Sequence, residues 1–114
     1  MSGSKAETLW PYARKDWTPK DPGDTDLFIV DATDKLAERP GALIAATPVF
    51  SSQRDDGGAA DLLFSQVIVG PGNQIVDVLI SGGTAGFVYL VTMQFRDTAG
   101  RTLDRSQLLA VVVR

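Results

Sequence analysis

The sequence predicts an all-β protein, an antiparallel β-sandwich of about seven short strands that follow an extended N-terminal arm. Short apolar runs recur from residue 26 onward and are separated by Gly, Pro, Asn and Asp residues, which favour turns. Apolar and polar side chains also largely alternate with a period of two between residues 89 and 96. We therefore expect an extended arm over residues 1–18 and a single domain over residues 19–114.

The N-terminal arm is polar overall, yet it contains both tryptophans of the chain. Its large side chains are Leu9, Trp10, Tyr12 and Trp17. Disordered segments are normally poor in aromatic residues, so the arm is expected to bury part of its surface. Two alternatives remain open. Trp10 and Trp17 could cover the sandwich of the same subunit, or the aromatic side chains could dock on a neighbouring subunit.

The domain is predicted to begin with a strand and a short helix. Residues 26–31 form an apolar run bounded by aspartates, which is typical of a strand. Residues 34–39 favour a helix, but Pro40 and the glycine after it end the helix within about two turns. We expect one helical turn here.

A second strand is predicted over residues 42–47. Pro48 lacks an N–H group and is expected to interrupt the strand before residues 49–50 continue it with a new partner. Residues 51–60 are predicted to be the most mobile loop, because they are polar and rich in glycine. The two aspartates in this loop lack the full ligand pattern of a calcium loop, so a solvated loop is expected rather than a metal site.

The middle of the domain is predicted to be a hairpin, with strands at 62–69 and 74–80 and a turn at 70–73. Two sets of side chains alternate along the second strand: Val76, Val78 and Ile80 on one face, and Ile75, Asp77 and Leu79 on the other. Both faces are largely apolar, so one of them is expected to meet a partner.

A glycine-rich segment at residues 81–86 follows this hairpin. It lacks the Lys-Ser/Thr ending of a phosphate-binding loop and opens no evident helix, so we expect it to carry the chain between the two sheets. Gly86 precedes Tyr89 by three residues, a spacing similar to the tyrosine corner of immunoglobulin-like sandwiches, in which the phenol bonds to upstream backbone. The alternative is an ordinary core tyrosine.

The domain is predicted to close with a hairpin. The side chains of its first strand that should face the core are Tyr89, Val91, Met93 and Phe95. Residues 97–100 form a plausible type I turn, in which Gly100 accepts a positive φ. The run at 108–113 is continuously apolar after a polar stretch, so a β-bulge is predicted near Gln107.

The composition excludes several classes of function. The chain contains neither cysteine nor histidine, so thiol chemistry, the commonest general base and the usual transition-metal ligands are absent. We therefore expect no enzyme activity and no cofactor. The net charge is −3 and the basic residues are scattered, which disfavours nucleic-acid binding. No apolar run approaches the roughly 20 residues that span a bilayer, and no secretion signal is evident, so a soluble protein is expected.

Two motifs in the C-terminal half stand out: Ser81-Gly82-Gly83-Thr84-Ala85-Gly86 leading to Tyr89, and Gly100-Arg101 leading to Asp104-Arg105-Ser106. Matching positions further upstream are Lys20-Asp21-Pro22, Asp31, Leu36 and Ile44. In combination over residues 19–113, these positions resemble a family of small virion structural proteins that tailed phages encode in their head-gene clusters.

The resemblance implies an immunoglobulin-like fold and a virion protein that is synthesised in the host cytoplasm. The function it implies is a non-catalytic capsid decoration or head-associated protein, a cement that binds neighbouring virion subunits. The alternative is a tail, baseplate or host-surface recognition module with the same fold. The expected partners are the major capsid protein or other head or tail subunits, with copies forming a homo-oligomer on the particle.

In such a virion protein, the residues expected to bind partners are Trp10, Tyr12, Trp17, Arg101, Asp104 and Arg105. The residues expected to have a structural role are Gly86, Tyr89 and Gly100. For Asp104 and Arg105 the alternative is an exposed ion pair or a solvated strand face, which would contribute little energy.

Overall fold

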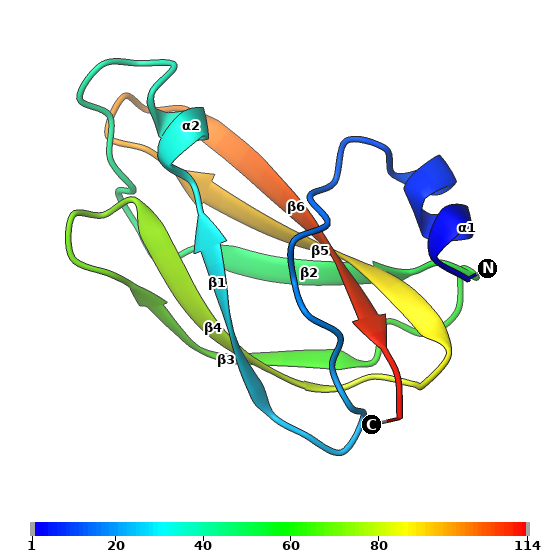
Figure 1. Ribbon diagram of the computed structural model, residues 1–114. Helices are drawn as coiled ribbons and strands as arrows, with labels where there is room; N and C mark the ends of the chain where they lie inside the picture. Colours follow the sequence, from blue (N-terminus) through cyan, green and yellow to red (C-terminus); the bar gives the residue numbers. More distant parts are fainter. Residues whose placement is uncertain (1, 114) are drawn as a thin grey trace.

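The computed structural model describes residues 2–113 and contains two antiparallel sheets of three strands each (Figure 1). The strands are β1 (Asp26–Asp31), β2 (Val49–Arg54), β3 (Leu62–Val69), β4 (Ile75–Gly82), β5 (Phe87–Arg96) and β6 (Thr102–Val111). Their order is β1-β4-β3 in one sheet and β2-β5-β6 in the other. The all-β prediction is confirmed, and the part of the chain that the structure describes contains six strands rather than about seven.

The core lies between the two sheets. The β5 side chains predicted to face inward are all buried, with at most 2% of their surface exposed: Tyr89, Val91, Met93 and Phe95. The opposing sheet contributes Phe28, Val30, Val76, Val78 and Ile80 to the same interior. Removing this apolar surface from water is the main term that holds the two sheets together.

The predicted turn between β5 and β6 is confirmed. The Asp97 carboxylate Oδ1 accepts the backbone N–H groups of Ala99 (3.1 Å) and Arg101 (2.8 Å). Gly100 has a φ of 86°, a conformation that costs glycine little and other residues more. The Asp97 side chain therefore replaces part of the hydrogen bonding that a continuing strand would provide.

The predicted β-bulge near Gln107 is wrong, because the ladder between β5 and β6 is uninterrupted. The continuous apolar run has another cause: both sides of β6 are covered. Leu109 lies in the core between the sheets, whereas Leu108 packs on the outer side beneath the N-terminal segment. An irregularity does occur in β3, between Ser65 and Ile68.

Residues 42–47 do not form the predicted strand. Their ladder contact is an isolated bridge between Ile44 and Asp97. The backbone N–H of Ile44 donates to the Asn73 carbonyl (2.9 Å), whereas the next N–H along the chain donates to the Arg96 carbonyl (2.9 Å). Because successive backbone groups bond to different segments, no continuous ladder can form.

The strand in this part of the molecule begins instead after Pro48. β2 pairs with β5 from Val49 to Arg54, so the first four residues of the predicted loop at 51–60 are strand. The predicted helical turn is confirmed as α2 (Thr33–Leu36), which ends before Pro40 and buries Leu36. Neither helix among residues 2–113 is long and apolar enough to cross a membrane.

The N-terminal segment is not extended throughout. Residues 2–9 form the helix α1 (Ser2–Leu9), in which alanine and glutamate have high helix propensity and after which Pro11 follows. Ala6 of α1 is buried against the outer side of β5 and β6, where it meets Val88 and Leu90. The helix therefore covers one end of the β2-β5-β6 sheet (Figure 1).

Between α1 and β1 the chain runs alongside β6. Arg14 and Lys20 form parallel bridges with Gln107 and Val111 of that strand. Lys20 is fully buried, and its ammonium group donates to the Gly82 carbonyl (2.8 Å). Backbone pairing and this buried cation together attach the segment to the domain.

Candidate partner-binding surfaces

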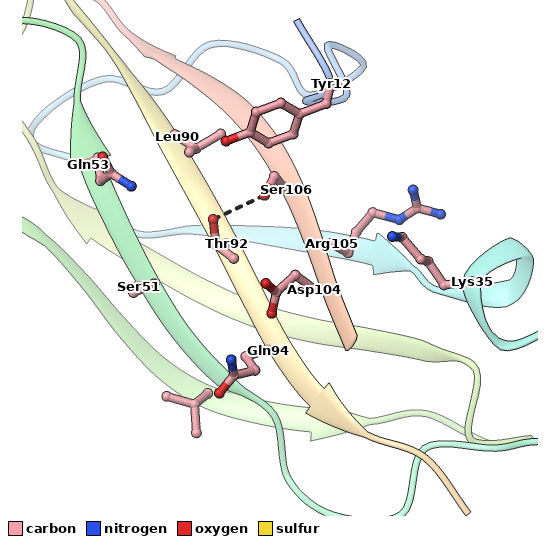
Figure 2. Close-up of a pocket in the computed structure, with 11 residues that line it drawn as sticks. Tyr12, Lys35, Ser51, Gln53, Leu90, Thr92, Gln94, Asp104, Arg105 and Ser106 are labelled. Carbon is pink, nitrogen blue, oxygen red and sulfur yellow. Dashed lines mark hydrogen bonds between the residues drawn. The ribbon is translucent and has the colours of Figure 1, made fainter. Parts of the chain in front are cut away.

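The outer face of the β2-β5-β6 sheet contains a hollow of about 650 Å³, called the polar hollow below (Figure 2). Its floor is formed by the outward side chains Ser51, Gln53, Thr92, Gln94, Asp104 and Ser106. These residues occupy alternate positions on three adjacent strands, which places them on one face.

Cross-strand pairing explains the chemistry of the polar hollow. Thr92 is directly opposite Ser51 on one side and Ser106 on the other. The Thr92 and Ser106 hydroxyl groups are hydrogen bonded at 3.1 Å. A row of hydroxyl and amide groups can exchange hydrogen bonds with a polar partner or with water.

Tyr12 is the N-terminal aromatic residue at the polar hollow. Its side chain is 68% exposed and lines one end of the hollow, where Figure 2 shows its ring near Leu90 and Ser106. Trp10 packs partly buried against the cluster beneath α1. Of these two predicted partner contacts, Tyr12 therefore offers the larger free surface.

Trp17 lies at the edge between the two sheets. Its ring packs on Phe28 with the ring centroids 4.7 Å apart, and its indole Nε1 donates to the Ile29 carbonyl (3.0 Å). Trp10 and Trp17 thus both contact their own chain, as the first of the two alternatives for the arm predicted. Trp17 is not among the residues that line the polar hollow.

The three charged residues that the sequence predicts to bind partners lie in two different places. Asp104 is exposed and lines the polar hollow, together with Arg105, whose guanidinium forms an ion pair with Asp34 of α2. Burial lowers the pKa of the Arg105 guanidinium, and nearby Arg14 lowers it further. The structure thus brings Tyr12, Asp104 and Arg105 to one surface.

Arg101 is at the turn after β5, away from this surface. Its guanidinium donates to Asp97 (2.7 Å) and to Glu38 (3.2 Å). Burial favours the neutral form of Asp97, but the hydrogen bonds from Arg101 outweigh that effect and lower the pKa of the carboxyl. These contacts give Arg101 a role within the turn.

Tyr89 forms the hydrogen bond that its spacing predicts. The buried hydroxyl accepts the Thr84 N–H (2.9 Å) and donates to the Asp61 carboxylate (2.5 Å). Burial and the Asp61 bond raise the pKa of Tyr89, while the bonds from Tyr89 and Thr84 lower that of Asp61. Gly86, with a φ of 96°, turns the chain from β4 into β5 beside this group. The cluster fixes the crossing between the sheets.

The outer face of the β1-β4-β3 sheet is different, because it is apolar. Its exposed side chains, called the apolar face below, are Leu27, Ile29, Leu63, Ile68 and Ile75, with exposed fractions of 40 to 66%, and the half-buried Leu79. The sequence predicted the β4 part of this surface from the alternation along residues 75–79. The contributions of β1 and β3 were missed, although β1 alternates in the same way; in β3 the irregularity between Ser65 and Ile68 interrupts the alternation.

Comparison with known proteins identifies the family. A family model described as Podophage GP4 fiber-tail adaptor protein gp77 matches residues 20–110. Searches of curated proteins and of solved structures gave no significant match. The expected relationship to phage virion proteins is confirmed, while the predicted capsid decoration finds no support in this family. Because the match spans all of β1 to β5 and nearly all of β6, the chain belongs to the podophage GP4 fiber-tail adaptor protein gp77 family, whose members are structural proteins of phage particles.

Proposed function

We propose that this protein is a non-catalytic adaptor that joins the tail of a podophage particle to its fibers. The family match over residues 20–110 carries this proposal, since it covers the strands on which both candidate surfaces are built. A tail location replaces the capsid decoration that the sequence suggested, and it agrees with the alternative of a tail module. The match also supports a domain that begins near residue 19, with the arm before it.

Two chemically different outer faces suit an adaptor. The polar hollow and the apolar face lie on different sheets, and the buried core lies between them. A protein bound at one face would therefore leave the other face free. Repeated copies around a symmetric tail would add avidity to each contact. Tyr12 and Asp104 are the proposed contacts on the polar side.

We also infer that the fold is immunoglobulin-like. The orders β1-β4-β3 and β2-β5-β6 correspond to the B-E-D and C-F-G strands of such sandwiches. The hydrogen-bonded Tyr89 lies near the start of β5, at the corner where immunoglobulin-like domains have their conserved tyrosine. The segment that pairs in parallel with β6 would supply the seventh strand position.

Co-sedimentation tests the adaptor function. Purified protein is mixed with tail particles assembled without it, with isolated fibers, and with heads of the same phage as the control. The expected result is saturable binding to tails, and fibers that join those tails only after the protein is added. Binding to heads alone would contradict the proposal and restore the capsid decoration, whereas binding to host cells alone would favour a recognition module.

A further inference from the structure

We propose that the apolar face binds one of the two virion partners through an apolar protein surface that carries a lysine or arginine, and that this cation pairs with Asp77. This inference rests on the proposed adaptor function and adds the chemistry of one partner. The carrying observation is a carboxylate flanked by exposed isoleucines on both neighbouring strands; the other carboxylate of this face, Asp31, lies opposite Ile75 near its edge.

Strand register places Asp77 between these isoleucines. Asp77 is directly opposite Ile29 on β1 and Ile68 on β3. In the next row, Leu79 is opposite Leu27. Side chains directly opposite one another in an antiparallel pair point to the same face, with their Cβ atoms about 5 Å apart. The carboxylate is therefore flanked by isoleucines on both sides.

Nothing in the described chain covers this surface. The helix α1 packs on β5 and β6 of the other sheet, and the segment after it runs along β6 (Figure 1). That segment reaches β1 through Trp17, which packs on the inward side chain of Phe28 and bonds to the Ile29 carbonyl, not to the outward side chains of the apolar face. The exposed isoleucines and leucines form a contiguous set by register, and soluble monomers rarely expose large contiguous apolar patches outside binding sites. The apolar face is thus suited to a protein partner.

The charge of this sheet determines the kind of partner. β1, β3 and β4 contain Asp26, Asp31 and Asp77 but no lysine or arginine. Among residues 2–113, the Asp77 carboxylate has no ion pair. A purely apolar partner would strip water from this carboxylate without replacing its hydrogen bonds, which is costly. A partner cation removes that cost and fixes the register of the contact.

The same charge argues against a second copy of this chain as the occupant. A two-fold contact centred on this face would bring the two Asp77 carboxylates together. Like charges in direct opposition are destabilising. The face therefore favours a different protein with complementary charge.

The test uses matched variants of the full chain, on the apolar face and away from both candidate surfaces. Asp77→Asn removes the central charge, and Glu7→Gln removes an exposed carboxylate of α1 in the same way. The double variant Ile29→Thr/Ile68→Thr removes apolar contact, and Val113→Thr, at a side chain that is 77% exposed, is its control. The probes are isolated fibers and tail particles assembled without the protein, each titrated separately, and circular dichroism checks that every variant is folded.

For one of the two probes, Asp77→Asn and Ile29→Thr/Ile68→Thr are each expected to weaken binding about tenfold or more, while both controls leave it unchanged. Unchanged affinity of both variants for both probes would overturn the inference and leave the adaptor function in place. A wild-type protein that binds neither probe would overturn both. A wild-type dimer that Ile29→Thr/Ile68→Thr makes monomeric, with probe binding intact, would show that a second copy occupies the face and would also overturn the inference.

Discussion

The outer faces of both sheets contain apolar side chains, at one end of the β2-β5-β6 sheet and over most of the β1-β4-β3 sheet, and they differ in what covers them. In β5 and β6, apolar side chains point outward at one end and are buried beneath α1, as Leu90 and Leu108 show. In β4 and its neighbours, apolar side chains also point outward, but Leu27 and Ile29 remain more than half exposed. Outward apolar side chains on a strand therefore indicate that another segment or a partner protein covers that strand. Whether the cover is the same chain or another protein depends on the tertiary structure.

Removing the N-terminal segment that covers β5 and β6 should have the largest effect on stability. Deletion of residues 2–13 removes Ala6, Trp10 and Ala13 and exposes the apolar side chains of β5 and β6 beneath them, and the expected loss is about 3–5 kcal/mol of the free energy of unfolding. Urea unfolding measures the loss, and dye binding to exposed apolar surface should increase. An unchanged midpoint would show that residues 2–13 contribute no cover in solution.

A matched pair of substitutions sharpens the comparison. Leu90→Ala creates a cavity beneath α1 and should cost about 2–3 kcal/mol, because the wild-type side chain is buried. Leu27→Ala on the uncovered face should cost less than about 1 kcal/mol, because that side chain is 57% exposed. Urea unfolding of both variants is the measurement. Equal costs would contradict the assignment of one face as covered and the other as open.

The crossing that joins the two sheets is the next most sensitive point. Tyr89→Phe leaves the Thr84 N–H without its acceptor and takes a donor from Asp61. The expected cost is about 1–2 kcal/mol. Thermal unfolding of the variant checks it, with Tyr12→Phe as the control because that ring is largely exposed. Identical unfolding temperatures for wild type and Tyr89→Phe would show that the hydrogen bonds of the Tyr89 hydroxyl do not stabilise this crossing.

The smallest expected effect is a pH dependence at the same crossing. The pKa of Asp61 is lowered by the bonds from Tyr89 and Thr84, so its stabilising contribution is complete above the ordinary pKa near 4 and is lost as the pH falls through the lowered value. Asp61→Asn should flatten the decline of stability between about pH 5 and 3 by less than about 1 kcal/mol. Parallel unfolding curves for wild type and variant across this range would contradict the prediction.

Much of the fold follows from local pattern. The strands at 26–31 and 62–69, the turn at Gly100 and the inward set of β5 were all predicted from alternation and turn chemistry. The strand expected at 42–47 and the bulge at Gln107 were wrong because each depends on which distant segment supplies a hydrogen-bond partner or a cover. Contacts with distant segments produce no periodic pattern of apolar residues, so the local sequence cannot predict them.

The candidate surfaces were less predictable than the fold. The sequence predicts Tyr12 and Asp104 as partner contacts, but no local pattern indicates that they line the same hollow, because Tyr12 precedes β1 and Asp104 lies in β6. For Trp17 the sequence left two alternatives open, and its packing on Phe28 depends on the path of the chain along β6. For the apolar face, the alternation along β4 was sufficient to predict a partner, and register then added Ile29 and Ile68.

The parallel pairing of the N-terminal segment with β6 also sets the order of events during synthesis. Arg14 and Lys20 leave the ribosome early, but the strand to which they bond is made after every other strand of the domain. Until then, the Lys20 backbone has no strand around Val111 to pair with, and the nascent chain must wait in a partly assembled state. Contacts between segments so distant in sequence slow folding, so the last step in completing the domain should be the return of its beginning to its end.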